Sequence, residues 1–141
     1  MSNKKPKNLN IGYEIAKKIK NLQQLSEYPP DKMVADSERI AEELSSKEVK
    51  TSQIRKIHSY IVKIYTEYKN NKTSGQLPTN ELQFLKPLLA YINVRNDRKM
   101  DSLQEVLSAA IDKIKTADDL EHFKKLYDSI LAYHRYYGRE R

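Results

Sequence analysis

The sequence predicts an all-α protein, a single compact bundle of five to six helices. Apolar residues recur every three or four positions through most of the chain, which is the spacing of one helix face. Glycine is scarce, with only three in 141 residues, and no segment shows the strict alternation of a strand. A chain of this length is expected to form one domain. We expect residues 1–8 to be a basic disordered tail and residues 9–141 to form the single helical-bundle domain.

Two helices are predicted on either side of the Tyr28-Pro29-Pro30 sequence, because proline ends a helix. The first runs from Leu9 to Leu25. The second, which is more acidic, runs from Asp31 to about Leu44.

The third and fourth helices are predicted on either side of a polar loop, Asn70 to Pro78. Thr51 or Ser52 is expected to cap the third helix. Its apolar stripe consists of Ile54, Ile57, Ile61, Ile64 and Tyr68. The fourth segment begins at Thr79 and carries apolar residues on most sides, which predicts the most buried helix of the bundle. Pro87 either kinks that helix or lies in its first turn.

The remaining two helices are predicted after charged connections. Asp101 or Ser102 is expected to cap the fifth. Residues 116–119 begin the last helix and place Asp118 and Asp119 in its first turn, where the helix dipole favours negative charge. Gly138 is expected to end it.

The net charge of +7 favours an anionic partner: RNA, DNA or an acidic membrane surface. Residues 51–100 contain nine basic and three acidic residues. In the third helix Lys56 and Lys63 point away from the isoleucine stripe, with Arg55 on the flank, so this face suits phosphate. An ordinary solvated helix face is the alternative. Further cations in the same part of the chain favour a binding surface; they are Lys86, Arg95, Arg98 and Lys99.

Most of the ten tyrosines are predicted to be core residues, because they fall on or beside apolar stripes. This group comprises Tyr65, Tyr68, Tyr91, Tyr127 and Tyr137. Tyr60 and Tyr136 are the better candidates for stacking on an exposed base.

The sequence does not predict an enzyme, a metal site or a cofactor. Of the three histidines, His134 is expected in the core and His58 beside the isoleucine stripe, and no His-Glu-x-x-His motif or Gly-rich phosphate loop occurs. One class of helical ribonuclease has four to six residues between an Arg and its His, but residues 51–53, 115–117 and 127–129, where that Arg would stand, contain no Arg. With no Cys and no apolar run of about 20 residues, we expect a cytoplasmic protein without a membrane span.

Three strings of residues resemble a known family. They are Thr51-Ser52-Gln53-Ile54-Arg55-Lys56; Leu85-Lys86-Pro87 with Leu89-Ala90-Tyr91 and Arg95; and Ala132-Tyr133-His134-Arg135-Tyr136-Tyr137-Gly138. In order and spacing they are similar to the small subunit of the type III-A CRISPR effector, the Csm complex, in which it is the second subunit of the Csm series. The resemblance runs from about residue 30 to residue 138 and leaves out the first helix.

The resemblance implies a protein without catalytic activity that stacks in several copies, head to tail, along the duplex of crRNA and target RNA. It implies contacts to the sugar-phosphate backbone, which agrees with the physics of an A-form duplex that is recognised by shape. By matching position, the resemblance assigns RNA contact to Arg55, Lys56, Lys86 and Arg95, whereas Lys63, Arg98 and Lys99 come from the charge pattern alone. The other Csm subunits, the backbone and the large subunit, are the implied protein partners.

Two alternatives remain open: the small subunit of the related type III-B complex, and a helical assembly module whose basic charge only aids solubility. Self-association is also expected. The loop that carries Gly75 joins two apolar helices, so opening it is one route by which two protomers exchange halves. We expect the isolated protein to form a homodimer that gives way to stacking in the complex.

Overall fold

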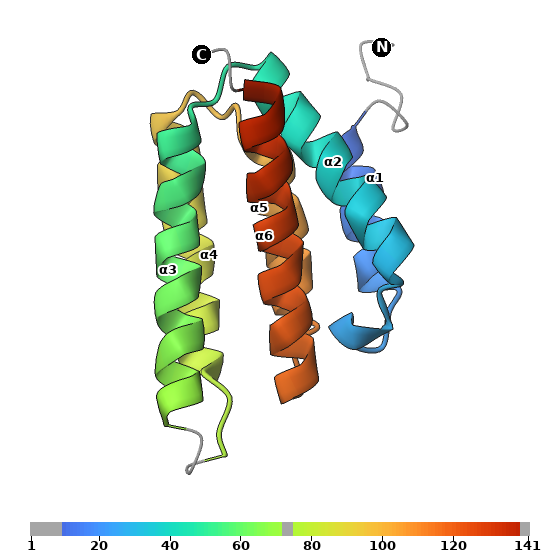
Figure 1. Ribbon diagram of the computed structural model, residues 1–141, viewed down its shortest axis with the longest axis vertical. Helices are drawn as coiled ribbons and strands as arrows, with labels where there is room; N and C mark the ends of the chain where they lie inside the picture. The colour runs from blue at the N-terminus through green and yellow to red at the C-terminus, as the bar shows by residue number, and fades with distance from the viewer. Residues whose placement is uncertain (1–9, 72–74, 139–141) are drawn as a thin grey trace, which may run out of the picture.

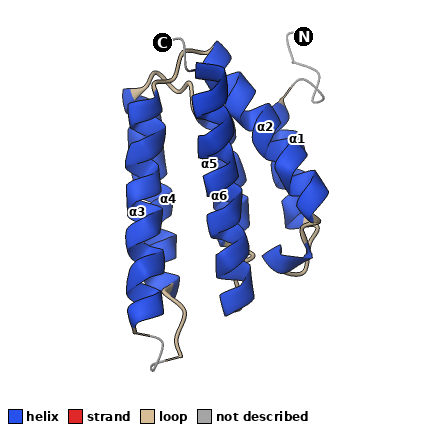
Figure 2. Ribbon diagram, viewed as in Figure 1, coloured by secondary structure: helices blue, strands red, loops and turns tan. Residues whose placement is uncertain are grey.

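The all-α prediction is confirmed. The computed structural model describes residues 10–71 and 75–138, and within these ranges every regular element is a helix (Figure 2). The predicted basic tail, residues 1–8, lies outside the described residues, as does the centre of the predicted hinge loop. The elements are α1 (Ile11–Lys20), the short 3-10 helix η2 (Leu25–Glu27), α2 (Pro30–Ser46), α3 (Thr51–Asn70), α4 (Thr79–Arg95), α5 (Asp101–Ile111) and α6 (Ala117–Gly138).

The helices form two layers of three. One layer holds α3, α6 and α2 side by side, and the other holds α4, α5 and α1 behind them (Figure 1). Helices α3 and α4, which are consecutive in sequence, form an antiparallel pair at one edge of the bundle, and α1 and α2 form the opposite edge. Helices α5 and α6 lie between these pairs, so both edges pack against them. The buried apolar residues form one contiguous cluster.

The core of α3 agrees with the predicted stripe, since Ile54, Ile57 and Ile61 are buried. Tyr127 of α6 is fully buried against this stripe, and its hydroxyl donates a hydrogen bond of 2.8 Å to the carbonyl oxygen of Ile54. His134 is also buried, as predicted, and its Nε2 lies 2.8 Å from the carbonyl oxygen of Val49, just before α3. Two contacts from α6 therefore hold α3 in register.

The first predicted helix is too long. Helix α1 ends at Lys20 instead of Leu25, and the chain then bends so that the amide of Leu25 donates to the carbonyl oxygen of Lys113 at 2.9 Å. Leu25 is fully buried. The segment η2 packs against α6, so the bend after α1 places Leu25 in the core.

Two predicted caps are also wrong by one position. Lys50 and Met100 hold the N-cap positions of α3 and α5, and Thr51 and Asp101 are the first helical residues. Neither cap residue caps with its own side chain. Instead, the amide of Met100 donates to Oδ1 of the buried Asn93 at 2.7 Å, so the start of α5 is stabilised from α4.

Helix α4 is not the most buried helix of the bundle, contrary to the prediction. Leu82, Leu85 and Leu89 are buried, but Phe84 is 74% exposed. Because α4 lies at an edge of the bundle, only one side of it meets other helices. Pro87 lies inside α4, well beyond its first turn. The shorter helix α5 is instead covered by α1 and α4 and is mostly buried.

Asp119 lies in the first turn of α6 and is fully buried. Its Oδ2 accepts hydrogen bonds from the amides of Lys115 and Thr116 at 2.8 and 3.0 Å, and Thr116 Oγ1 accepts from the Asp119 amide at 3.2 Å. Its Oδ1 accepts from the Ser26 amide at 2.7 Å. Burial works to raise the pKa of Asp119, but these backbone donors outweigh burial and hold the pKa below its ordinary value. The residue is therefore a reciprocal helix cap that also fastens η2 to α6.

We expect Asp119→Asn to destabilise the protein by about 1.5–3 kcal/mol at neutral pH, because several donors would lose a charged acceptor. A depressed folded-state pKa contributes stability that is fully present above the unfolded-state pKa and is lost as pH falls through the folded-state value. The variant should therefore approach the wild type in stability as pH falls below about 4. Urea unfolding at a series of pH values measures this difference. A gap between the two proteins that is constant from neutral to acidic pH would contradict the ionised cap.

Gly12 is the closest approach between α1 and α5. A Cβ added at this position would lie 2.5 Å from the Cα of Ser102, which is backbone and cannot move aside. We expect Gly12→Ala to destabilise the protein by about 1–3 kcal/mol through overpacking, although alanine is the better helix former by about 1 kcal/mol. The matched control is Ala132→Gly at an exposed position of α6, where alanine should be the more stable residue. Thermal unfolding in which Gly12→Ala stabilises the protein would show that the two helices separate easily.

Candidate nucleic-acid interface

The exposed face of α3 presents three of the predicted cations. Arg55, Lys56 and Lys63 are all exposed, and Lys56 and Lys63 lie seven positions apart and therefore on the same side of the helix. The Ser59 hydroxyl beside them donates to the carbonyl oxygen of Arg55 at 3.1 Å, so it is engaged within the helix. The cationic side chains project from the opposite side of the helix to its buried isoleucines.

A hollow of about 340 Å³ lies between α3 and α4 at the end of the pair near Gln53. Its lining residues are Gln53, Lys56, Tyr91, Ile92, Arg95 and Asn96. Lys56 from α3 and Arg95 from α4 thus border the same depression, although they are far apart in sequence. The Asn96 amide nitrogen donates to Gln53 Oε1 at 3.3 Å and to the carbonyl oxygen of Ile92 at 2.8 Å. This amide pair joins α3 to the end of α4 beside the hollow.

Arg95 is held in place by Tyr91, one helical turn earlier. Its Nη1 donates to the tyrosine hydroxyl at 3.2 Å, and the guanidinium carbon lies 5.7 Å from the centre of the ring. Tyr91 was predicted to be a core residue, but 58% of it is exposed. The apolar stripe of α4 that suggested burial extends beyond the side that meets the bundle. The exposed ring instead orients an arginine whose charge stays accessible.

Lys86 does not belong to the same face. It lies nine positions before Arg95, which is two and a half turns at about 3.6 residues per turn, and so points to the opposite side of α4. Its Nζ contacts Oδ1 of Asp112, the residue that follows α5, at 2.6 Å. The structure therefore brings Lys56 and Arg95 together and leaves Lys86 in an ion pair with Asp112.

Arg98 and Lys99 occupy the tight turn between α4 and α5. Asp97 and Arg98 have positive φ angles of 57° and 58°, and the Arg98 amide donates to the carbonyl oxygen of Asn93 at 2.9 Å. Both cationic side chains are exposed, with Arg98 Nε 3.5 Å from Asp101 Oδ1. The turn follows directly after Arg95, so these charges extend the basic surface of Lys56 and Arg95 past the end of α4.

The residue that shapes this turn is Asn93, which the sequence analysis did not single out. It is buried, and its amide nitrogen donates to Asp101 Oδ1 at 2.6 Å and to Gln104 Oε1 at 2.9 Å. Its position between Ile92 and Val94 is the signal in the sequence, because a lone amide in an apolar segment near a helix end often satisfies backbone groups of the next turn.

The three histidines have separate local partners. His58 Nε2 lies 2.9 Å from Asp128 Oδ1, and the His122 ring contacts the carbonyl oxygen of Asp118. Over residues 10–71 and 75–138, no three His, Cys, Asp or Glu side chains gather in a way that could hold a metal ion. No helix in these ranges is long and apolar enough to cross a membrane.

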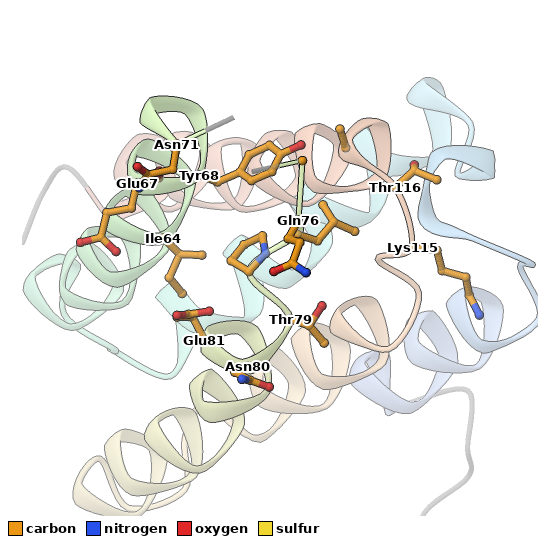
Figure 3. A pocket seen from close by; sticks show the side chains of 14 residues that line it. Ile64, Glu67, Tyr68, Asn71, Gln76, Thr79, Asn80, Glu81, Lys115 and Thr116 are labelled. Carbon is orange, nitrogen blue, oxygen red and sulfur yellow. The ribbon is translucent and has the colours of Figure 1, made fainter. Parts of the chain in front are cut away.

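A larger hollow of about 810 Å³ opens at the other end of the α3–α4 pair (Figure 3). Glu67 of α3 and Glu81 of α4 border it, as does Lys115 before α6. Two carboxylates against one lysine make this hollow less suited to phosphate than the one between Lys56 and Arg95.

The comparisons with known proteins give one match. A family model described as Csm2 Type III-A matches residues 27–140. It spans α2 to α6, which include the basic face of α3, the hollow and the α4–α5 turn, and it leaves out α1 and all of η2 except Glu27. No curated protein and no solved structure matches the chain.

Proposed function

Because the chain belongs to the Csm2 family of type III-A, we propose that it is the non-catalytic small subunit of a type III-A CRISPR RNA-guided interference complex, the Csm complex. The family match confirms the resemblance that rests on the three strings of residues. In this proposal the protein acts in the cytoplasm in antiviral defence. Several copies stack along the duplex of crRNA and target RNA and contact its sugar-phosphate backbone.

The observation that carries RNA contact is the pairing of Lys56 and Arg95 across the hollow between α3 and α4. Phosphate contacts position a protein on nucleic acid without reading its sequence. With Arg95 the cationic surface spans two helices instead of one helix face. Arg55 and Lys63 extend the surface along α3, and Arg98 and Lys99 extend it past α4. A subunit that accepts any guide sequence needs this kind of contact.

Lys86 remains in the proposed set through its match to the family string. It lies on the other side of α4, where Asp112 is its partner. Contact with RNA there requires the lysine to leave an ion pair, so we expect Lys86→Ala to affect RNA binding less than Arg95→Ala.

The partners in this proposal are crRNA, target RNA and the other Csm subunits, both backbone and large. The isolated protein forms a homodimer that gives way to head-to-tail stacking on the guide. The family match to type III-A favours this assignment over the small subunit of the type III-B complex. A helical assembly module without RNA binding is the other alternative, and salt-dependent RNA binding separates it from the proposal.

We expect the triple variant Arg55→Ala, Lys56→Ala and Arg95→Ala to bind all RNA sequences more weakly, and by the same factor. Each lost phosphate contact should flatten the slope of log affinity against log salt by roughly 0.7–0.9. Fluorescence anisotropy with unrelated RNA duplexes at several salt concentrations measures both effects.

The matched control removes the same charge elsewhere, through Lys20→Ala, Lys32→Ala and Lys125→Ala on α1, α2 and α6, where all three lysines are exposed. These changes lower the net charge equally but leave the α3–α4 surface intact. Equal weakening by the control triple would show that only net charge matters. Loss of one RNA sequence with retention of another would exclude backbone contact.

We expect the purified protein to leave labelled RNA and DNA intact with Mg²⁺, Mn²⁺ or Zn²⁺ present. The three histidines lie apart, and each has a local partner that accounts for it. Gel analysis after long incubation tests this. Cleavage that copurifies with the protein and disappears in His122→Ala would overturn the non-catalytic assignment. His134 is less useful for this test, since it is buried and contacts the backbone before α3.

A further inference from the structure

The outer side of α4 is apolar and uncovered. Phe84 is 74% exposed, Val94 is 62% exposed and Tyr91 is 58% exposed. Leu85 and Leu89, on the inner side of the same helix, are each only 2% exposed. Isolated surface apolar residues need no explanation, but several on one helix face mark an interaction surface. The RNA contacts proposed above use cations, with Tyr91 orienting one of them, and leave Phe84 and Val94 unexplained.

The exposed side has an ordered sequence. Positions 81, 84, 88, 91 and 95 alternate in spacing between three and four residues, so they form a single seam along the helix, as in a coiled coil. We call these five residues the α4 seam; four of them are exposed, whereas Leu88 is half-buried and also packs against the core of its own chain. The seam begins with the acid Glu81, continues through Phe84, Leu88 and Tyr91, and ends with the base Arg95. The order of residue types is the same when the seam is read from either end: a charged residue, an aromatic, an aliphatic, an aromatic and a charged residue. Only the signs of the two terminal charges are exchanged.

We propose that the α4 seam binds the α4 seam of a second copy of this chain in an antiparallel arrangement, with the two-fold axis at Leu88. A two-fold interface is self-complementary, so each contact occurs twice. Glu81 of each copy then faces Arg95 of the other, and Phe84 of each copy faces Tyr91 of the other. The inference rests on the self-association in the proposed function, to which it assigns a surface and a direction.

The order of the charges favours a second copy of this chain, bound antiparallel. Glu81 and Arg95 lie equally far from Leu88, seven positions before it and seven after it, so antiparallel pairing matches opposite charges at both ends. Parallel pairing would set Glu81 against Glu81 and Arg95 against Arg95, and juxtaposed like charges oppose association. An RNA backbone fits the seam less well, because it would meet a carboxylate and exposed apolar side chains.

The structure also prepares Arg95 for this contact. Its hydrogen bond to the Tyr91 hydroxyl, 3.2 Å long, limits the freedom that the side chain would lose on pairing. Arg95 also borders the basic hollow, so the same residue would serve RNA in the complex and the second copy in isolation. The homodimer must then open before this surface can contact RNA.

The test uses charge reversal at the two ends of the seam. E81R makes both ends of the seam positive, and R95E makes both ends negative. Each variant alone should therefore dimerise at least tenfold more weakly than the wild type. An equimolar mixture of the two should dimerise about as well as the wild type, because both end pairs become opposite in sign. The double variant E81R/R95E should also recover. Sedimentation equilibrium over a concentration series measures all four samples.

Two results would overturn the proposal. A wild-type chain that stays monomeric up to about millimolar concentration has no such interface. A dimer that persists unchanged in E81R, or a mixture that does not recover, places self-association elsewhere, such as in an exchange of halves through the loop before α4. Phe84→Ala should weaken the dimer without altering the charge, which separates the apolar contact from the electrostatic one.

RNA binding by E81R and Phe84→Ala distinguishes this inference from the proposed function, because neither residue is among the proposed RNA contacts. Both variants should bind RNA at least as well as the wild type while failing to dimerise. Dimerisation as expected with no RNA binding by any of the proteins would overturn the RNA-binding function and leave the seam intact. RNA binding by a wild-type chain that never dimerises would overturn the α4 seam and leave the RNA-binding function intact.

Discussion

The position of α3 depends on the hydrogen bond from the buried hydroxyl of Tyr127 to the carbonyl oxygen of Ile54. Tyr127 has no exposed surface, so its hydroxyl must find a partner inside the bundle. Desolvation raises the pKa of this phenol well above its ordinary value, so it remains a donor. A donor of this kind, far from water, ties α6 to the first turn of α3. The direction in which α3 presents Arg55 and Lys56 follows from that contact.

The second link, from His134 to the carbonyl oxygen of Val49, acts at the entry to α3. The His134 ring also contacts the Thr51 hydroxyl, with Nδ1 3.4 Å from Oγ1, and so connects the C-terminal string of residues to the string that begins at Thr51. Two of the three family strings thus meet in space, with the last supporting the first from behind. In the middle string, Tyr91 and Arg95 border the hollow opposite Lys56. The resemblance in sequence therefore corresponds to one connected part of the fold.

The apolar residues of α4 have two different surroundings, because the helix lies at an edge of the bundle. Its inner leucines pack against the core, whereas its outer aromatic residues meet solvent. Apolar residues on all sides are usually a sign of a buried helix. On a helix at an edge, the outer apolar residues instead mark a candidate interaction surface. In the proposed homodimer, the acid at one end and the base at the other end of that side favour an antiparallel second copy.

The sequence by itself determined the all-α class, the places of five interhelical connections to within a few residues, and the segments that carry the cations, because helical periodicity and charge are local properties. It also identified Ile54, Ile57 and Ile61 as core and His134 as a buried histidine. Only the tertiary structure decided which cations share a surface. Lys86 and Arg95 are close in sequence yet lie on opposite sides of α4, whereas Lys56 and Arg95 come together from separate helices. The tertiary structure also decided that α4 lies at an edge. The sequence of one helix cannot reveal this, because the burial of a helix depends on what packs against it. The roles of Asn93 and Asp119 were decided in the same way, since their donors and acceptors come from segments that only folding brings near.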